Sequence, residues 1–464
     1  MANPEDYDLV ILGSGEPGKF LAWTLAAEGQ RVAVVERQYV GGSCPNVACL
    51  PSKNVIHSAK VASYARRGAE FGVAAWGGAT DMAAVRDRKR KMVAGLVEFH
   101  LAKFAASGAE LVLGAGTFTG PRTVEVALWG GGTRTLRGEN VVINTGSRAA
   151  IDATPGLREA GPLTHVEALD LDRVPEHLVV LGGGYVGLEL AQAFRRFGSR
   201  VTVVERNDNL LHREDFDVSE AMATLFADEG IAVSTGTAVT RVTGTSGAAA
   251  QLHGTRGGDT VVIEGSHLLV AAGRTPNTDG IGLELAGVEL DARGYVKVDE
   301  RLRTAAAGVW AVGDCAGSPQ FTHIGFDDFR IVRDNLAGGH RVTTGRPVPS
   351  CLFTDPELAR VGLSEREADA RGIPYRLAKL PMSAMLRTWT LSEPRGFLKA
   401  LVEKGGDRVL GFTAFGVGAG EVMAVVQVAM AAGLPYTALR DAVLTHPTLA
   451  EGLVGLFAAV PATA

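Results

Sequence analysis

The sequence predicts an α/β fold class, with two copies of a strand–turn–helix–strand unit and a separate α+β segment that begins near residue 345. Three observations predict it: the length, an internal repeat, and the short strands and apolar helices of the last segment. At roughly 150 residues per domain, 464 residues are too many for one hydrophobic core and suggest about three domains. A multidomain chain is therefore expected.

The internal repeat is the most informative of these observations. The segment DLVILGSGEPGKFLAWTLAAEGQRVAVVER (8–37) matches HLVVLGGGYVGLELAQAFRRFGSRVTVVER (177–206) at one constant offset. Each copy reads as an apolar strand, a Gly-x-Gly-x-x-Gly turn, an amphipathic helix and a second apolar strand that ends in Glu. The matched pairs are Gly13 and Gly182, Gly15 and Gly184, Gly18 and Gly187, and Glu36 and Glu205.

The glycine pattern alone is weak, because a chain with 59 glycines among 464 residues matches it by chance about once. Its context is specific: each match follows a strand, opens a helix and has an acidic residue about 20 residues further on. The glycines let the backbone turn tightly and approach a pyrophosphate at the helix N-terminus, while the Glu accepts hydrogen bonds from ribose hydroxyls. The sequence therefore predicts two Rossmann-like dinucleotide sites.

Two of the four cysteines lie close together in GGSCPNVACLPSK (41–53), at Cys44 and Cys49. They could form a metal half-site, a structural bridge, a redox pair or two unrelated buried thiols. A zinc half-site would require Cys-x2-4-Cys and further Cys or His partners at similar spacing, and none follows. Cys315 and Cys351 have no sequence partner and are interpreted as inert buried thiols.

Two dinucleotide sites suggest an electron path between them, and the cysteine pair gives that path an end. If the first copy holds FAD and the second a nicotinamide nucleotide, hydride passes to the flavin, which then opens a disulfide of Cys44 and Cys49. Five residues of regular helix rise about 7.5 Å, more than the roughly 4.4–6.8 Å between disulfide-linked Cα atoms, so the oxidised loop cannot be helical throughout. Pro51 suits a first helical turn, and a helix N-terminus near Cys49 would favour its thiolate.

Charge and composition exclude several other classes of protein. A formal net charge of −5 gives no electrostatic basis for nucleic acid or an acidic membrane surface, and RDRKRK (86–91) is interpreted as a solvated helix face. The apolar stretches near the end, such as VMAVVQVAMAAGL, are shorter than the roughly 20 residues of a membrane-spanning helix. The start MANPEDYDLV lacks the pattern of a secretion signal, so a cytoplasmic location is expected, where a disulfide is more often catalytic than structural.

With these motifs in place, the chain resembles the class I FAD-dependent pyridine nucleotide-disulfide oxidoreductases, in the branch of mercuric reductase and dihydrolipoamide dehydrogenase. GGSCPNVACLPSK resembles the redox-active signature of that family, and Ala48 departs from it where most members carry Gly. The resemblance covers nearly the whole chain. Its other motifs are the two nucleotide units, INTGS (143–147), AAGRTPN (271–277), GVWAVGDCAG (308–317) and THPTLAE (445–451).

The resemblance implies roles for six residues. Cys49 would lie against the flavin as the charge-transfer thiol, and Cys44 would attack substrate as the interchange thiol. His446 would be the acid–base partner of the thiols, oriented by Glu451, and would reach the active site from the other subunit of a homodimer. The last pair is Lys53, expected near the flavin N5 edge, and Glu189, its ion-pair partner.

Further cofactor contacts follow from the same motifs, and no metal ligand is expected. The residues concerned, besides the repeat glycines and glutamates and Lys53, are Gly42, Ser43, Gly116, Thr145, Gly146, Ser147, Asp314, His323, Tyr185, Gly273 and Arg274.

The order of the motifs predicts the domain layout. An FAD-binding domain would cover 1–150 and be completed by 271–344, where GVWAVGD returns the chain to the flavin with Asp314 on the ribityl side. A NAD(P)-binding domain would cover 151–270. The remainder, 345–464, would be an interface domain used for dimerisation, with strands near FTDPELARVG (353–362) and GFLKALV (396–402) in a sheet with helices on one side.

The choice of nicotinamide nucleotide depends on the end of the second repeat. Glu205 would accept a hydrogen bond from a free 2′-hydroxyl and repel a 2′-phosphate, which favours NADH. Arg206 and Arg213 weaken this inference, because either could turn toward a 2′-phosphate, so NADPH stays open.

The electron acceptor is the least determined feature. The ending LFAAVPATA lacks the cysteine pair with which mercuric reductases take up the metal, which argues against mercuric ion. We expect reduction of a small disulfide or of an oxidised sulfur species such as hypothiocyanous acid, on which a mercuric-reductase-like relative acts. The alternatives are dihydrolipoamide dehydrogenase activity, including a role as the flavoprotein subunit of a multienzyme assembly, and an activity like that of the mercuric or metal-ion reductases.

Overall fold

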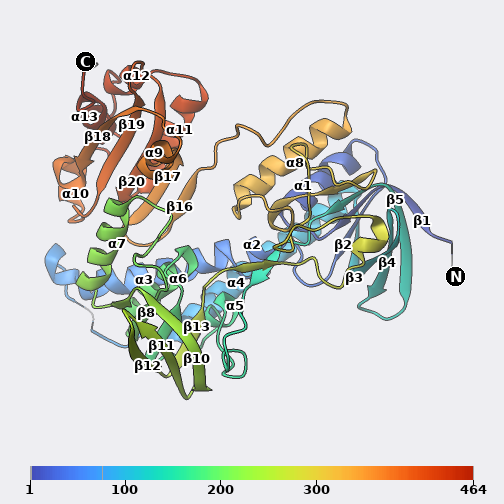
Figure 1. Cartoon of the computed structure of the whole chain (residues 1–464), viewed down its shortest axis with the longest axis horizontal. Coiled ribbons are helices and arrows are strands. Elements are labelled where there is room, and N and C mark those ends of the chain that lie inside the picture. Colours follow the sequence, from blue (N-terminus) through green and yellow to red (C-terminus); the bar gives the residue numbers. More distant parts are fainter. Residues whose placement is uncertain (1–2, 76, 463–464) are drawn as a thin grey trace.

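The structure, a computed structural model, describes residues 3–75 and 77–462, which form three regions, each built around a sheet (Figure 1). In Figure 1 the first region, in blue and teal with the yellow-orange α8, lies at the opposite side of the picture from the red C-terminal region. The green region lies below, and the helices α3 and α4 extend from the first region toward it. The chain is therefore an α/β protein of several sheets, as predicted.

The first strand of the chain, β1, lies inside the first sheet, between two parallel neighbours. β1 (Glu5–Leu12) pairs in parallel with β2 (Val32–Glu36) and with β5 (Thr133–Ile143). The runs of Val, Ile and Leu in these strands are buried, as expected for parallel strands that are covered on both faces. The other strands are β3 (Glu110–Gly120) and β4 (Thr123–Leu128), which form an antiparallel ribbon with β5, and β15 (Val309–Ala311), which pairs in parallel with β5.

Helices cover one face of this sheet and the antiparallel ribbon covers the other. Side chains of α1, α4 and α8 share one core cluster with Leu9 and Ile11, whereas Val124 and Val126 of the ribbon pack with Val10 and Leu12 on the opposite face. The helices of this region are α1 (Glu16–Ala27), α2 (Ser43–Asn46), α3 (Cys49–Arg66), α4 (Met82–Ser107) and α8 (Thr322–Leu336), with 3-10 turns η1 (Gly68–Phe71), η2 (Leu283–Ala286) and η3 (Gly313–Ala316).

The second region repeats the same unit. A parallel sheet runs in the order β13-β7-β8-β9, and α6 connects β7 to β8 as α1 connects β1 to β2. An antiparallel ribbon of β10, β11 and β12 accompanies it, and β6 pairs with β14 where the chain passes between the two regions. The elements are β6 (Ser147–Ala149), α5 (His165–Ala168), β7 (His177–Leu181), α6 (Tyr185–Phe197), β8 (Arg200–Val204), α7 (Phe216–Asp228), β9 (Ala232–Ser234), β10 (Thr237–Thr245), β11 (Ala249–Arg256), β12 (Asp259–Gly265), β13 (His267–Val270) and β14 (Arg274–Pro276).

The third region is an antiparallel sheet in the order β16-β17-β20-β19-β18. Leu398, Ala400 and Val402 of β19 face α11 and α13, whereas Leu401 packs with Ala368 of α9 on the other face. The expectation of helices on one side therefore holds for α11 and α13 and is wrong for α9. The elements are β16 (Ser350–Leu352), β17 (Glu357–Gly362), α9 (Glu365–Ala370), β18 (Tyr375–Pro381), η4 (Met382–Ala384), α10 (Leu386–Thr390), β19 (Phe397–Glu403), β20 (Val409–Gly416), α11 (Ala419–Ala431), α12 (Tyr436–Arg440) and α13 (Gly452–Ala458).

The repeat glycines occupy equivalent positions in the two sheets. Gly13 and Gly182 have positive φ angles of 102° and 117°, and a Cβ at either would lie 2.5 Å or less from a backbone oxygen, that of Asn144 or Ala271. This close approach and the left-handed backbone both require glycine. Among the described helices, none is long and apolar enough to span a membrane.

Candidate functional site

The two cysteines of the predicted redox pair lie at the junction of two helices. Cys44 is in the short helix α2, and Cys49 begins α3, with Pro51 in the first turn. Between them the helix is interrupted, because Ala48 adopts φ −126° and ψ −102°, outside the helical region. The segment is therefore not regular helix throughout, with both cysteines present as free thiols.

The two thiols are free, half-buried and differ in proton affinity. A hydrogen bond from the Cys44 thiol, a second from Thr322 and the positive charge of Lys53 lower the pKa of Cys49 to about 6, against the opposing effect of burial. The same hydrogen bond, together with burial and the charge on Cys49, raises the pKa of Cys44. The pair therefore holds its negative charge on Cys49 and its proton on Cys44.

Thr322 is a member of this site that the sequence interpretation did not include. Its hydroxyl oxygen lies 3.2 Å from Cys49 Sγ, and it is the first residue of α8. The two residues are 273 positions apart. In the sequence Thr322 directly precedes His323, which is among the predicted cofactor residues, and no motif marks the threonine itself.

Lys53 and Glu189 form an ion pair across the first two regions. Lys53 Nζ lies 2.7 Å from Glu189 Oε2, and the other carboxylate oxygen accepts a hydrogen bond of 2.9 Å from the backbone N–H of Phe353. The ammonium group also lies 4.7 Å from the centroid of the Phe353 ring. Because Lys53 follows Cys49 by one turn of α3, the pair places a fixed positive charge beside the thiols.

His446 and Glu451 also lie together, in the C-terminal region of the chain. Both carboxylate oxygens of Glu451 are 3.0 Å from His446 Nδ1, and the His446 side chain is 59 % exposed. Within the described chain no hydrogen bond or ion pair connects His446 to Cys44 or Cys49. The carboxylate of Glu451 orients the exposed imidazole through Nδ1, and among the described residues Nε2 has no hydrogen-bond partner.

The Glu36 carboxylate is hydrogen-bonded to the first glycine turn and to the residues that follow Glu36. This buried carboxylate accepts from the Ser14 N–H and hydroxyl at 2.9 and 2.6 Å, and from the N–H groups of Gln38 and Tyr39 at 2.7 and 2.9 Å. A ribose hydroxyl would have to share an oxygen with one of these donors. The carboxylate is thus oriented by the turn itself before any nucleotide binds.

Several other predicted cofactor residues converge beside this turn. Ser147 donates a hydrogen bond to Asp314, and Arg274 Nε lies 3.7 Å from the same carboxylate. The buried hydroxyl oxygen of Thr145 has no hydrogen-bond partner in the described chain, and a Cβ at Gly146 would meet nothing within 4 Å. An unpartnered buried hydroxyl beside open backbone suits a polar ligand, so the residues present fit FAD.

The second glycine turn has the same features. Glu205 is buried and accepts hydrogen bonds from the N–H groups of Gly183 and Asn207 at 2.7 and 2.8 Å. A Cβ at Gly184 would meet nothing within 4 Å, so this side of the α6 N-terminus is open to a ligand, which fits a nicotinamide nucleotide. Tyr185 opens α6, and its hydroxyl lies 3.1 Å from Glu214 and 3.3 Å from Ser350 Oγ.

The remaining predicted residues are placed differently. His323 Nε2 lies 2.9 Å from the carbonyl oxygen of Pro349, and its ring stacks on that of Phe321. A Cβ at Gly116 would lie 2.7 Å from Leu12, so this glycine is needed for packing within the sheet. Gly42 has a φ of 83° and lies against Gly15, while Ser43 is exposed at the start of α2, and Gly273 has a φ of 149°.

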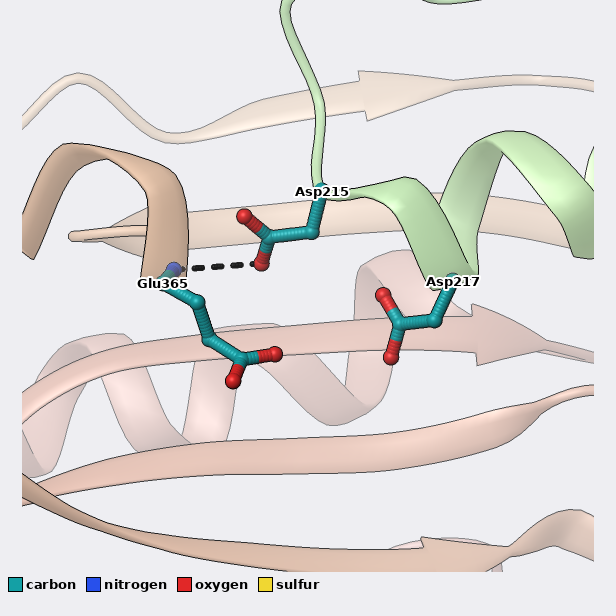
Figure 2. A group of neighbouring side chains, drawn as sticks. All are labelled: Asp215, Asp217 and Glu365. Carbon is teal, nitrogen blue, oxygen red and sulfur yellow. Dashed lines mark hydrogen bonds between the residues drawn. The ribbon is translucent and has the colours of Figure 1, made fainter. Parts of the chain in front are cut away.

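Three carboxylates gather outside this site, where no cluster was predicted. Asp215, Asp217 and Glu365 point toward one another between α7 and α9 (Figure 2). Lys399 Nζ lies 2.7 Å from Asp215 and 2.8 Å from each of the other two, and its side chain is fully buried. The position a metal ion would take is thus filled by an ammonium group, and the cluster joins the second region to the C-terminal sheet.

Comparison with known proteins gives a consistent result. Residues 7–328 match the family model described as pyridine nucleotide-disulphide oxidoreductase, and residues 348–456 match the dimerisation domain of that family. Over 460 residues the chain is 36% identical to the probable pyridine nucleotide-disulfide oxidoreductase RclA of Escherichia coli, covering 98% of this chain and 99% of the relative. It is 37% identical to a mercuric reductase of Streptomyces lividans, covering 96% of this chain and 94% of the relative.

A solved structure shows the same similarity in three dimensions. The Cu(II) complex of the HOCl-induced flavoprotein disulfide reductase RclA from Escherichia coli superposes with a TM-score of 0.89. The sequences of the two are 35% identical, and the match covers 98% of this chain and 99% of that one.

Proposed function

Since the chain belongs to the pyridine nucleotide-disulphide oxidoreductase family and is an NAD(P)H-dependent, FAD-containing disulfide oxidoreductase, we propose that Cys44 and Cys49 are its redox pair and that it reduces a small disulfide or an oxidised sulfur species. The observation that carries this proposal is the opposed proton affinity of the two thiols at the α2–α3 junction. The other cysteines are less suited, because burial raises the pKa of both Cys315 and Cys351 and neither is paired with a thiol of lowered pKa, as Cys44 is with Cys49.

The proposed chemistry transfers two electrons and two protons. FAD, when bound, supplies hydride acceptance from NAD(P)H and passes the electron pair to a disulfide. In the reduced pair, Cys44 attacks the substrate disulfide, forms a mixed disulfide and releases one thiol. Cys49 then attacks Cys44 Sγ, which restores the internal disulfide and releases the second thiol. Each disulfide converted to two thiols thus consumes one electron pair from NAD(P)H and two protons.

A base is needed for the first of these steps, because the pKa of Cys44 is raised and its thiol is a poor nucleophile until it is deprotonated. We assign this role to His446 of a second subunit. The exposed imidazole, held at Nδ1 by Glu451, and the match to a dimerisation domain support the assignment. In this arrangement Nε2 takes the proton of Cys44 and later returns it to the departing thiol.

A mixed-dimer experiment tests the assignment. We would pair a Cys44→Ser subunit with a His446→Ala subunit, each with its own affinity tag. If the histidine acts across the interface, one of the two sites combines an intact cysteine pair with an intact histidine, and the mixed dimer reduces disulfides. If the histidine acts within its own chain, both sites are damaged and activity falls by the factor of about 10²–10⁴ typical of lost acid–base catalysis.

The reciprocal dimer is the matched control. A subunit that carries both substitutions, paired with an unchanged subunit, has no complete site if the histidine acts across the interface and one complete site if it acts within the chain. Activity in this dimer and none in the first would reject the proposed role of His446.

For the nucleotide we propose NADH. Glu205 supports it, because the buried carboxylate is fixed by two backbone N–H groups at the end of β8, where a 2′-phosphate would meet a negative charge. Arg206 and Arg213 are exposed on the same stretch and are the features that would favour NADPH.

The acceptor is tested by stopped-flow reoxidation of the enzyme that has first been reduced with NADH. The panel should contain cystine, oxidised glutathione, lipoamide, hypothiocyanous acid, hypochlorous acid, Hg(II) and Cu(II). We expect a small disulfide or an oxidised sulfur species to reoxidise the thiols fastest. Fastest turnover with lipoamide would instead identify a dihydrolipoamide dehydrogenase, and fastest turnover with a metal ion would identify a metal-ion reductase.

A further inference from the structure

Lys19 is a buried charge inside the first nucleotide unit, and none of the steps above uses it. It follows Gly18 of the glycine turn on α1, and its side chain is 6 % exposed. Lys19 Nζ lies 2.7 Å from Glu16 Oε2, 3.1 Å from His100 Nε2 and 3.5 Å from the carbonyl oxygen of Gly41. A lysine this deeply buried is rare unless its charge is paired, so the role of Lys19 is inferred from these three contacts.

His100 is arranged to accept a hydrogen bond from this ammonium group. Its Nδ1 lies 2.5 Å from the carbonyl oxygen of Leu96, which can only accept, so Nδ1 carries the proton and Nε2 offers its lone pair to Lys19. Burial and the charge of Lys19 lower the pKa of His100, which keeps the ring neutral. His100 therefore fixes Lys19 through a hydrogen bond and, as a neutral ring, does not compete with it for the carboxylate of Glu16.

Glu16 is the reason a positive charge is needed at this point. It is the first residue of α1, at the end of the helix where the N–H groups of a Gly-x-Gly-x-x-Gly turn bind a pyrophosphate. A carboxylate there would repel the phosphates of FAD and would also add negative charge near Cys44, whose raised pKa owes a part to Glu16. The ion pair with Lys19 neutralises Glu16.

The same lysine contacts the turn that leads into the redox helices. Gly41 has a φ of 90°, a Cβ on it would lie 3.0 Å from the His100 ring, and its N–H donates to Ser14 Oγ at 2.9 Å. The carbonyl oxygen of Gly41 faces Lys19. Lys19 thus connects α1, α4 and the backbone three residues before Cys44.

We propose that Lys19 is a positioning residue for FAD: by neutralising Glu16 at the N-terminus of α1, it allows the glycine turn to hold the pyrophosphate. His100 fixes the ammonium group in place. The proposal requires the effect of losing Lys19 to depend on the charge of Glu16, which a purely structural role in packing would not.

The test measures the release of FAD from the holoenzyme, followed by the rise in fluorescence of free flavin after dilution. Lys19→Met should release FAD about tenfold to a hundredfold faster, the range expected for the loss of a charge-assisted contact. Glu16→Gln combined with Lys19→Met should return most of the way to the unchanged rate, since the uncompensated carboxylate is gone. Lys379→Met is the matched control, because it removes an ammonium group 2.6 Å from Asp217, outside the glycine turn, and should leave FAD release unchanged.

Two results would overturn the proposal: release from the Lys19→Met enzyme at the unchanged rate, or equally fast release from the single and double variants. If Lys19→Met does not fold, Glu16→Gln alone decides. FAD release from it no faster than from the unchanged enzyme supports the charge argument, and faster release contradicts it. Because the readout is flavin retention, it is independent of which disulfide the enzyme reduces.

Discussion

Cys49 Sγ lies 3.2 Å from the hydroxyl oxygen of Thr322, so the first turn of α3 and the first turn of α8 meet at the thiol with the lower pKa. The hydroxyl donates to the thiolate and stabilises its negative charge. The two helices come from distant parts of the chain, and the proton affinity of the thiol depends on how they are packed together.

Thr322→Val should therefore raise the pKa of Cys49 above its value of about 6. The thiolate loses a hydrogen-bond donor, whereas the shape of the side chain is nearly unchanged. The rate of alkylation of the reduced enzyme by iodoacetamide, followed as a function of pH, should show its midpoint at higher pH. Thr322→Ser, which keeps the hydroxyl, is the control, and a midpoint that stays in place in the valine variant would contradict the role of Thr322.

Lys53→Met should also raise the pKa of Cys49 in the same assay. The reason is different, because Lys53 acts through its positive charge. Its effect should shrink in high salt, unlike that of Thr322. Lys60→Met is the control, because Lys60 lies on the same helix and forms a comparable ion pair, with Asp355 at 2.9 Å. Its loss should not move the midpoint. An equal shift in both variants would point to a general disturbance of α3.

Glu205→Ala should lower kcat/KM for NADH about tenfold more than kcat/KM for NADPH, because only NADH offers a free 2′-hydroxyl to the carboxylate. Steady-state kinetics with both nucleotides check this. Arg206→Ala is the companion variant and should lower the use of NADPH alone. Should the ratio of the two nucleotides stay constant in the Glu205 variant, this residue does not select between them.

Lys399→Met should destabilise the protein by about 3–5 kcal/mol, the cost of leaving buried carboxylates without their counter-ion. Thermal unfolding followed by circular dichroism would show it, and exposed Lys404→Met should unfold as the unchanged protein does. Unchanged unfolding of the Lys399 variant would show that the cluster contributes no net stability.

The same cluster predicts how stability depends on pH. Against the opposing effect of burial, hydrogen bonds and the charge of Lys399 lower the pKa values of Asp215 and Asp217 below 3.8, so their contribution is present above that pH and is lost as the pH falls through the native values. The pKa of Lys399 is raised above 10.5, so its contribution is present below that pH and is lost as the pH rises through the native value. The free energy of unfolding, measured with urea as a function of pH, should therefore show a plateau between these two pH limits. The Lys399→Met variant should lack this plateau.

The sequence was sufficient for the family, the fold class and both nucleotide units, because each unit carries its own local signature. Gly13 and Gly182 show why: a positive φ and a backbone contact under 3 Å leave glycine as the one residue that fits, so the motif reports the turn. The antiparallel ribbons β3–β5 and β10–β12 were not predicted, since alternating strands of this kind carry no equivalent motif.

The site was predictable only where its residues lie in a motif. Lys53 and Glu189 each belong to one, and they meet at 2.7 Å, but the contact of Cys49 with Thr322 joins positions 273 residues apart. Lys19 lies in no motif that marks it as buried, and its burial follows from the packing of α4, which carries His100, against α1. Such contacts depend on tertiary packing, which no local pattern records.

The position of β15 has a consequence for synthesis of the chain. This strand completes the first sheet by pairing with β5, yet it follows the whole of the second region in sequence. On the ribosome the second sheet can close as soon as β13 emerges, whereas the first must wait, with the edge of β5 uncovered, until residues 309–311 have been made. During synthesis the second sheet can therefore be complete before the first. The exposed edge of β5 is the point at which a chaperone would be of most use.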